Sequence, residues 1–513
     1  MEARRLIGLK SNAVVDWPSI AIDAILDLMK VDPDRLATLV GAWSAAPGPL
    51  YERLGAAIAA AIDRGELAPG AVLPTERELA ARLAVSRTTV VGAYGELKET
   101  GRLESRQGRG TWVADSAGGR PGPERSFSAE LYAGLMGGTA GLIELTAACP
   151  PATSLVGRVL AGMPGPLLAE AVEGTGYLPA GLPELRERIA EHMTTGGLPT
   201  AADQVIVTTG AQQAINLATM LLGEPGQSVL VEEVTFPGAL DVTRGAGMRP
   251  IAVPLDDGGV IPEALGDLLE RVRPSFVYLV PPHHNPTGSV LSDRRSRRVA
   301  ELSARYRVPV VEDLTLRHLP LDDRPLPAPI AAHGPDRSTI TIGSLSKVLW
   351  GGLRVGWIRA ARPVIERLMR LKITADLGSP VLAQTLAASL IPRFDEAVHE
   401  RRAFLAGRYA ALTSALAEHL PEWTWDRPRG GCTLWARMPG GDARAFGQVA
   451  QRCGVNVVPG QVLSAEGRHA DRLRLPFVHE PPVIEEAVRR MAVAWDLYAG
   501  AGARGEQPAA LIV

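Results

Sequence analysis

The chain has 513 residues, more than one ordinary domain, and a chain of this length is expected to form about three folding units. With 46% hydrophobic and 21% charged residues, its composition is that of a globular protein with a normal core. The formal net charge of −2 excludes a global attraction to nucleic acid, so any DNA binding must come from a local surface.

Cysteine usage and hydropathy exclude further classes. The three cysteines, Cys149, Cys432 and Cys453, are scattered and form no C-x-x-C motif. They predict neither a disulfide framework nor a zinc site, and they fit a reducing compartment. The first residues lack the apolar run of a signal peptide, and no uninterrupted apolar run of about 18 residues occurs. We therefore expect a cytoplasmic protein with no membrane partner.

Residues 1–49 form an N-terminal extension to which the sequence assigns no role. SIAIDAILDLMKV (19–31) and DPDRLATLVGAW (32–43) have apolar residues at roughly helical spacing, which predicts one or two short helices. The alternative, that the segment is a family-specific decoration or a mispredicted start, is as good an interpretation as the helices.

Residues 50–115 have the pattern of three helices. LYERLGAAIAAAIDRGEL is amphipathic and ends before APGAVLP. TERELAARLAV predicts a second helix with a capping box formed by Thr75 and Glu78. SRTTVVGAYGELKETG predicts a third helix, with Ser86 as its N-cap and Gly101 as its stop signal.

Further along the chain, RLESRQGRGTWVA predicts two short strands around Gly108 and Gly110, so residues 50–115 are predicted to form a winged helix-turn-helix. Residues 116–141 are rich in Gly, Ser and Pro and predict a flexible linker. Residues 142–502 alternate helical patterns with short β-branched runs, which predicts an α/β domain with a mainly parallel sheet. The runs are QVIVTT, SVLVEEV, RPIAVPL, FVYLV, VPVVED and STITIGS, while CTLWARMP and DRLRLPFV predict strands of a smaller α+β part. Residues 503–513 are expected to be a loose tail.

The third helix is the candidate DNA reader, because the second helix of a helix-turn-helix motif enters the major groove with its first residues. Arginine suits guanine, and threonine suits phosphates or base edges. Residues 50–113 carry nine basic and eight acidic side chains, so charge alone does not indicate DNA, and a small packed domain is the alternative. The residues expected at DNA are Arg77, Ser86, Arg87, Thr88 and Thr89 on the helices and Gln107, Gly108 and Arg109 in the wing.

The run LPTERELA…SRTTV…AYGELKETG…QGRGTWV resembles the GntR-type winged helix along its full length. The resemblance implies that this domain binds double-stranded DNA. In that family the position two residues after the second threonine is often a further arginine, whereas this chain has Val91. This departure predicts the loss of one contact and an altered specificity.

Five motifs in the later part each stand at the end of a predicted strand. TTGAQQAI opens a helix whose free N–H groups suit a phosphate. VEEVTFPG supplies the ring of Phe236, and PPHHNPTG holds Asn285 in a turn. VVEDLT ends in Asp313, a carboxylate suited to a pyridinium nitrogen, and GSLSKVLWGGLR carries Lys347 and Arg354. Taken singly, each motif also fits a cap or a loop. S-x-x-K alone also fits a serine acylase, but the S-D-N and K-T-G elements of those enzymes are absent.

In this order, the five motifs resemble the fold-type-I pyridoxal-phosphate (PLP) aminotransferases over roughly residues 142–500. The resemblance implies PLP as cofactor, with Lys347 forming the Schiff base and Asp313 binding the ring nitrogen. It implies that Phe236 stacks on the ring and that Asn285 bonds the phenolic oxygen. The phosphate would be held by Ala211, Gln212, Ser344, Ser346 and Arg354, and Tyr177 would approach this phosphate or that of a partner subunit.

Two further positions bear on activity. Arg474, in LRLPF, matches the arginine that takes the α-carboxylate of an amino acid in a bidentate fork. The aminotransferases usually have a tyrosine two residues after the aspartate, and this chain has Thr315. The shorter side chain predicts that a hydrogen bond to the phenolic oxygen is lost or passes through water, which counts against fast transamination.

A GntR-type head, a linker and an aminotransferase-like body resemble the MocR-type transcriptional regulators. The resemblance implies a regulator that senses PLP, an amino acid or an amine through aldimine formation at Lys347. It also implies a head-to-tail, domain-swapped homodimer. The alternatives are a working aminotransferase with an attached DNA-binding domain and a PLP-free module that uses the fold as a dimer scaffold. The complete set of cofactor-facing residues argues against the scaffold.

Overall fold

The computed structural model describes residues 31–40, 49–63, 66–67, 70–106, 110–114, 141–335 and 338–503. They belong to two compact units, one within Met1–Glu124 and the other within Arg125–Val513. The predicted helix over 19–31, the linker over 116–141 and the tail over 503–513 lie outside the described residues, except for one residue at one end of each. Among the described helices, none is long and apolar enough to cross a membrane.

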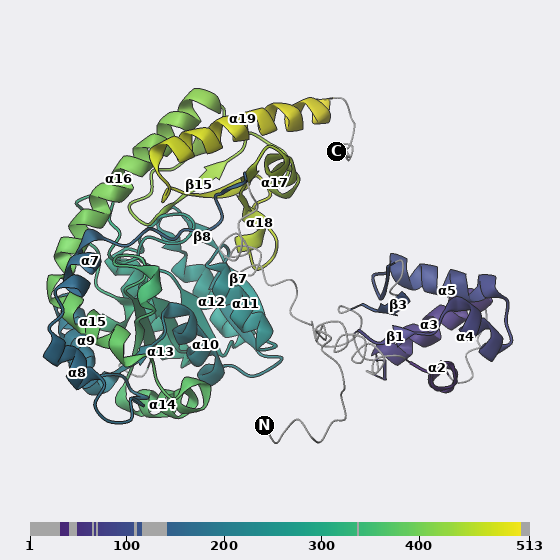
Figure 1. The fold of residues 1–513 in the computed structure, drawn as a ribbon, viewed down its shortest axis with the longest axis horizontal. Coiled ribbons are helices and arrows are strands. Elements are labelled where there is room, and N and C mark those ends of the chain that lie inside the picture. Colours follow the sequence, from purple (N-terminus) through teal and green to yellow (C-terminus); the bar gives the residue numbers. More distant parts are fainter. Residues whose placement is uncertain are drawn as a thin grey trace, which may run out of the picture. The chain divides into compact units, whose positions relative to one another are not determined.

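The three predicted helices of the N-terminal unit are confirmed as α3 (Leu50–Asp63), α4 (Glu76–Leu83) and α5 (Arg87–Glu99) (Figure 1). The capping box is present: the Thr75 hydroxyl accepts from the Glu78 N–H, and the Glu78 carboxylate accepts from the Thr75 N–H at 2.9 Å. Ser86 is the N-cap of α5 and accepts from the Thr89 N–H. These caps satisfy N–H groups that a helix leaves open in its first turn.

The wing of this unit has three strands instead of the two predicted. The strand order is β1 (Val72–Leu73), β3 (Gly110–Val113), β2 (Leu103–Arg106), and both pairings are antiparallel. The extra strand β1 lies in APGAVLP, the stretch that follows the predicted end of the first helix. Two residues are too short a run for an alternating pattern to reveal.

The head begins before Leu50, which corrects the predicted boundary. Helix α2 (Pro33–Val40) confirms the predicted helix over 32–43, and Leu36 and Val40 are buried in the same core as α3, α4 and α5. The Val31 N–H donates to the Val72 carbonyl at 2.8 Å, and α2 also forms an ion pair with α4. Residues 31–40 are therefore part of the winged-helix core and not a separate extension.

The C-terminal unit is built on a seven-stranded sheet that is parallel except for one strand. All six predicted strands are present, and together with a seventh, β13, they line up in the order β5, β13, β12, β11, β10, β6, β7. Strand β13 runs antiparallel to both of its neighbours. The sequence did not predict β13, because its residues GWIR directly follow the turn that was interpreted as a cofactor loop. The strand bounds are Val205–Thr208, Gly356–Arg359, Thr339–Ser344, Val310–Asp313, Phe276–Leu279, Ser228–Glu232 and Arg249–Val253.

Alternate residues of the central strands face two separate apolar cores. Val277 and Val310 pack into the smaller core with helices α12 and α13. Tyr278 and Val311 face the larger core, which also includes residues of α9, α10 and α15. Because both faces are buried, these strands read as continuous apolar runs in the sequence. The helices of this part are α7 (Ser154–Ala161), α8 (Gly165–Ala171), α9 (Pro183–Thr195), α10 (Ala211–Leu222), α11 (Pro237–Gly245), α12 (Pro262–Val272), α13 (Asp293–Tyr306), α14 (Arg362–Asp376) and α15 (Val381–Leu390).

The smaller α+β part confirms the two strands predicted near the end of the chain. Its sheet has the order β14 (Thr424–Trp425), β15 (Thr433–Arg437), β18 (Arg472–Pro476), β17 (Val458–Pro459). Figure 1 shows the long helices α16 (Phe394–His419) and α19 (Pro481–Ala503) beside it. The remaining elements are α17 (Ala443–Arg452), α18 (Gly460–Leu463), the parallel pair β4 (Ile143–Glu144) and β16 (Val455–Asn456), and the hairpin β8 (Leu255–Asp256) and β9 (Gly259–Val260).

Candidate DNA-binding and cofactor sites

The N-terminus of α5 presents a polar, exposed face. Ser86, Arg87 and Thr88 are exposed, and the Ser86 hydroxyl lies 2.7 Å from the hydroxyl of Thr88 and 2.8 Å from that of Thr89. Arg77 on α4 is also exposed. In the described part of the head no acidic side chain forms an ion pair with Arg77 or Arg87. Both guanidinium groups are therefore available to an anionic partner.

Other predicted DNA contacts are only partly described. Gln107, Gly108 and Arg109 lie outside the described residues, so their role stays a prediction. The strands that lead to them are described, and Arg106 pairs with Gly110 across the hairpin. Val91 is 47% exposed on the recognition helix, so an apolar side chain stands where the GntR family often has an arginine.

The cofactor motifs of the C-terminal unit meet at one edge of its sheet. Strands β5, β6, β10, β11 and β12 run in the same direction, so their carboxyl ends share this edge. Asp313 ends β11 and Ser344 ends β12, while the motifs with Phe236 and Asn285 follow β6 and β10. Ligands of open α/β sheets bind at this edge.

Arg354 holds the turn before α10. Its Nη2 donates to the Thr209 carbonyl at 2.5 Å, and Gly210 adopts a positive φ of 100° beside it. A Cβ on Gly210 would come within 2.9 Å of Arg354 Nη2, so glycine permits the approach. The turn is followed by Ala211 at the first position of α10, where free N–H groups favour an anion.

Residues that are predicted to contact the phosphate or the ring also contact one another. The Ser344 hydroxyl donates to the Ser346 hydroxyl at 3.1 Å, and the Ser346 N–H donates to Ser344 Oγ at 3.2 Å. Gln212 Nε2 donates to the carbonyl of Gly238 at 3.1 Å, and the Phe236 ring lies against the same glycine. The motifs after β5 and β6 are thus in direct contact.

Asp313 is a buried carboxylate with two neutral donors. The Tyr278 hydroxyl donates to Oδ2 at 2.8 Å, and the Thr315 N–H donates to Oδ1 at 2.8 Å. Burial raises the pKa of Asp313, and the hydrogen bonds from Thr315 and Tyr278 offset part of the rise. Each oxygen can still accept a further bond, and a cation there would relieve the desolvation. Tyr278 is a site residue that the sequence did not indicate, because its place in a buried strand reads as core.

Lys347 and Arg474 both reach the segment that follows β4. Lys347 Nζ donates to the Ala148 carbonyl at 2.7 Å, and Arg474 donates from Nη2 to the Thr146 carbonyl. Burial raises the pKa of the Cys432 thiol, and the charges of Lys347 and Arg474 act in the opposite direction. Both cations therefore lie near Cys432, and the carbonyl groups that they bind belong to the same short segment.

Asn285 and Tyr177 differ in their surroundings. Asn285 Oδ1 is buried and has no hydrogen-bond partner among the described residues. The two ends of an amide are assigned from their partners, so this end can equally present its NH₂ group to a ligand. Tyr177 is 65% exposed, and no described contact joins it to the other cofactor residues of its own chain.

Glu312, the neighbour of Asp313, gives a pH-dependent prediction. Burial raises the pKa of Glu312 to about 7, although the N–H groups of Ile330 and Ala331 and the Thr341 hydroxyl lower it. The pKa of Glu312 in the folded protein exceeds the ordinary value of 4.5, so the folded state favours the protonated carboxyl. The contribution of this carboxyl to the free energy of unfolding is therefore fully present below pH 4.5 and is lost as the pH rises through 7. The full loss is about 3 kcal/mol.

Glu312→Gln should therefore lose less stability than the wild type between pH 5 and pH 8, by up to about 3 kcal/mol. Urea unfolding of the body at both pH values measures this difference. Glu422→Gln, a change at an exposed position, is the control and should follow the wild type. An equal pH dependence in Glu312→Gln and wild type would show that Glu312 is not the titrating group.

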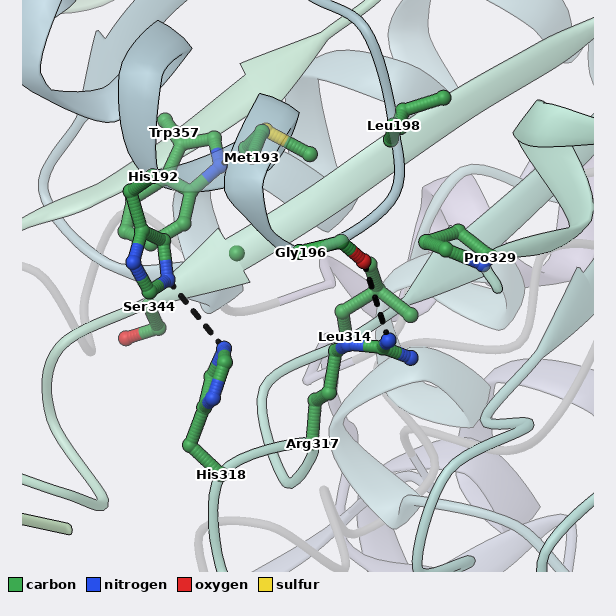
Figure 2. A pocket seen from close by; sticks show the side chains of 11 residues that line it. His192, Met193, Gly196, Leu198, Leu314, Arg317, His318, Pro329, Ser344 and Trp357 are labelled. Atoms are coloured by element: carbon green, nitrogen blue, oxygen red, sulfur yellow. Dashed lines mark hydrogen bonds between the residues drawn. The ribbon is translucent and has the colours of Figure 1, made fainter. Parts of the chain in front are cut away.

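A small hollow behind Ser344 is not large enough for an amino acid. Figure 2 shows His192 and His318 beside it, joined by a 3.2 Å hydrogen bond between their Nε2 atoms, with Arg317 bound to the Gly196 carbonyl. Its volume of about 30 Å³ holds one or two water molecules. Burial lowers the pKa of His192 and takes the pKa of His318 well below its usual range, so the pair is neutral near pH 7.

The residues at the sheet edge fit PLP. The buried carboxylate of Asp313 suits the ring nitrogen, the buried amide end of Asn285 lacks a hydrogen-bond partner among the described residues, and the N-terminus of α10 suits a phosphate. A lysine on the next loop supplies an amine. A winged helix-turn-helix head and a body of the fold-type-I aminotransferase architecture together define a chimeric class of DNA-binding proteins.

Comparison with known proteins gives the same division. Residues 50–113 match the family model of bacterial regulatory proteins of the gntR family, and residues 161–491 match that of aminotransferases of class I and II. YdfD of Bacillus subtilis, an uncharacterized HTH-type transcriptional regulator, is 31% identical over 76% of this chain and 84% of its own length. The probable rhizopine catabolism regulatory protein MocR of Rhizobium meliloti is 28% identical over 84% of this chain and 87% of its own length.

Among solved structures, the body is similar to LysN, the α-aminoadipate aminotransferase of Thermus thermophilus, in complex with N-(5'-phosphopyridoxyl)-L-leucine. The TM-score is 0.64 and the identity 30%, over 74% of this chain and 96% of that one. The chain belongs to the MocR-type transcriptional regulators, in which a GntR-type winged helix precedes a class I/II aminotransferase domain.

Proposed function

We propose that this regulator binds PLP at Lys347 and changes its DNA binding in response to PLP, an amino acid or an amine. The observation that carries the proposal is the convergence of Lys347, Asp313 and the α10 N-terminus at one sheet edge, in a chain whose recognition helix has an exposed N-terminus. PLP supplies an aldehyde that bonds reversibly to a primary amine, with loss of one water. A sensor requires such a reversible bond.

The residues of the chain divide the binding task. Arg354, Ser344 and Ser346, with Ala211 and Gln212 of the α10 N-terminus, bind the phosphate. Phe236 packs against the ring, and Asp313 holds the ring nitrogen in its protonated state. Asn285 donates to the phenolic oxygen. Arg474 binds the carboxylate of an incoming amino acid.

The regulator acts on double-stranded DNA as a homodimer with head-to-tail protomers. Tyr177 supports this arrangement, because its exposed ring has no described partner among the cofactor residues and is available to a second subunit. Arg77, Ser86, Arg87, Thr88 and Thr89 contact DNA, and the wing residues Gln107, Gly108 and Arg109 extend the contact. An effector shifts the dimer between states only by the difference in its affinity for them.

A working aminotransferase is the second candidate, and a specific observation favours it. Lys347 and Arg474 both donate hydrogen bonds to carbonyl groups of the segment that follows β4. An enzyme that transaminates an α-amino acid requires a lysine and an arginine close to each other in this way. Thr315 counts against fast turnover, since its backbone N–H goes to Asp313 and no tyrosine stands at this position. The two candidates differ in the step that comes after amine binding.

The visible absorption spectrum of the purified protein with PLP, before and after a panel of amino acids and amines, tests the proposal. We expect a band that shifts with one class of amine and then holds. A band that disappears and returns with a keto acid would favour the aminotransferase. The absence of any band with PLP supplied would contradict both and leave the fold as a scaffold.

A further inference from the structure

Lys372, on α14, is a fully buried lysine that none of the cofactor motifs includes. Its Nζ donates to both oxygens of Asp376, at 2.8 and 2.7 Å, and lies 3.3 Å from Ser379 Oγ and from Gln213 Oε1. Desolvating an ammonium group costs free energy even when it is paired. Burying Lys372 therefore costs free energy, and the residues that it contacts are those whose positions it can fix.

The contacts lead from Lys372 to the start of α10. Gln213 Nε2 donates to Asp376 Oδ2 at 2.7 Å, and Gln213 Oε1 accepts the Thr209 N–H at 2.9 Å. Burial raises the pKa of Asp376, but hydrogen bonds from Gln213 and Lys372 outweigh it and hold that pKa below its usual range. A charged Asp376 fixes which end of the Gln213 amide faces it, and so which end faces Thr209.

Both backbone polar groups of Thr209 are hydrogen-bonded. Its N–H is bound by Gln213, and its carbonyl accepts from Arg354 Nη2 at 2.5 Å. The next residues are Gly210, the N-cap of α10, and Ala211, its first residue. A change in the backbone angles of Thr209 would redirect the first N–H groups of the helix and release Arg354. Both are the groups that the proposed function assigns to the cofactor phosphate.

The turn that follows α14 touches the segment that carries Tyr177. Gly378 donates its N–H to Asp376 Oδ1 at 3.0 Å and adopts a positive φ of 137°. A Cβ at Gly378 would come within 2.9 Å of the Leu178 carbonyl oxygen, so the turn lies directly against the backbone next to Tyr177. The Lys372–Asp376 ion pair is thus linked through Gln213 to the turn before α10, and through Gly378 to the backbone next to Tyr177.

We propose that Lys372 is a positioning residue for the cofactor phosphate, acting through Asp376 and Gln213 on the turn Thr209–Ala211. The inference rests on the proposed function, because it assumes that a phosphate monoester binds at this turn. It predicts a selective effect. The part of the affinity for PLP that comes from its phosphate depends on Lys372, whereas bond formation at Lys347 does not.

Pyridoxal, which lacks the phosphate but carries the same aldehyde, separates these two contributions. The full-length protein is titrated with PLP and with pyridoxal, and the dissociation constants are read from the visible absorption band. In Lys372→Met we expect the affinity for PLP to fall about tenfold, in the range seen for residues that support metal ligands from outside. The affinity for pyridoxal should stay within about twofold of wild type, because no phosphate contact is involved.

Gln213→Met keeps the test decisive if Lys372→Met fails to fold, because it leaves the ion pair intact and breaks only its link to Thr209. It should show the same selective loss. Arg367→Met, at an exposed position of α14, is the matched control and should bind both aldehydes as the wild type does.

Equal losses for PLP and pyridoxal in both variants would overturn the inference, because the network would then support the body in general. Unchanged affinities for both aldehydes would overturn it as well. A wild-type protein that binds neither aldehyde would overturn the proposed function and this inference together. Normal binding by the wild type with unaltered binding by the variants would overturn only this inference.

Discussion

Lys347→Ala should abolish the visible band of the PLP-bound protein and make its affinity for DNA independent of PLP and of amines. Lys347 is the amine at the sheet edge, with its Nζ held 2.7 Å from the Ala148 carbonyl, and alanine offers no group to condense. Bare DNA affinity should stay at the cofactor-free value of the wild type, since the substitution lies in a different compact unit from the head. Spectra and fluorescence-anisotropy titrations of DNA on the same samples measure both effects.

Lys98→Ala is the control for this prediction. Lys98 lies in the last turn of α5 and is exposed, so its removal takes away a surface amine without touching the sheet edge. The band and the effector response should both persist in this variant. Regulation that survives in Lys347→Ala would show that the bond at Lys347 is not the sensor.

Arg87→Ala should weaken DNA binding by about 1–3 kcal/mol, which is roughly a 5- to 150-fold rise in Kd. Arg87 is the first residue of α5, is exposed and forms no ion pair in the described part of the head, so its guanidinium is available to a base or a phosphate. The measurement uses a duplex enriched by the purified protein from random sequences, at several salt concentrations. A contact to guanine relaxes specificity at one position, whereas a phosphate contact lowers the salt dependence.

The same variant must leave the cofactor site untouched. Its absorption band with PLP, and the shift with amines, should equal those of the wild type. Lys98→Ala, three turns along the same helix, should change DNA affinity much less, because the first residues of a recognition helix reach the groove. Equal losses in both variants would indicate a general electrostatic effect and argue against specific reading by Arg87.

Local chemistry explains which features the sequence predicted well. Thr75 and Glu78 form the predicted capping box because both partners lie within one helical turn. The parallel strands were visible as β-branched runs because both faces of the sheet are buried. The strand-end motifs with Asp313 and Ser344 could be placed at one edge, since parallel strands share the direction of their carboxyl ends.

The features that escaped prediction depend on contacts distant in the sequence. Residues 31–40 join the head through the bond from Val31 to Val72, which no local pattern announces. Tyr278 reads as a core residue of a strand, and only the neighbouring strand brings Asp313 to its hydroxyl. Lys372 reads as an ordinary helical lysine until its burial and its partner Asp376 are seen.

The central claim is that bond exchange at Lys347 changes how the heads bind DNA. The most direct test is to titrate the PLP-bound protein with the amine that shifts its band, recording the spectrum and the affinity for the enriched duplex in parallel. We predict that both change with the same midpoint and that DNA affinity changes about fivefold or more. A complete spectral shift with constant DNA affinity would contradict this claim.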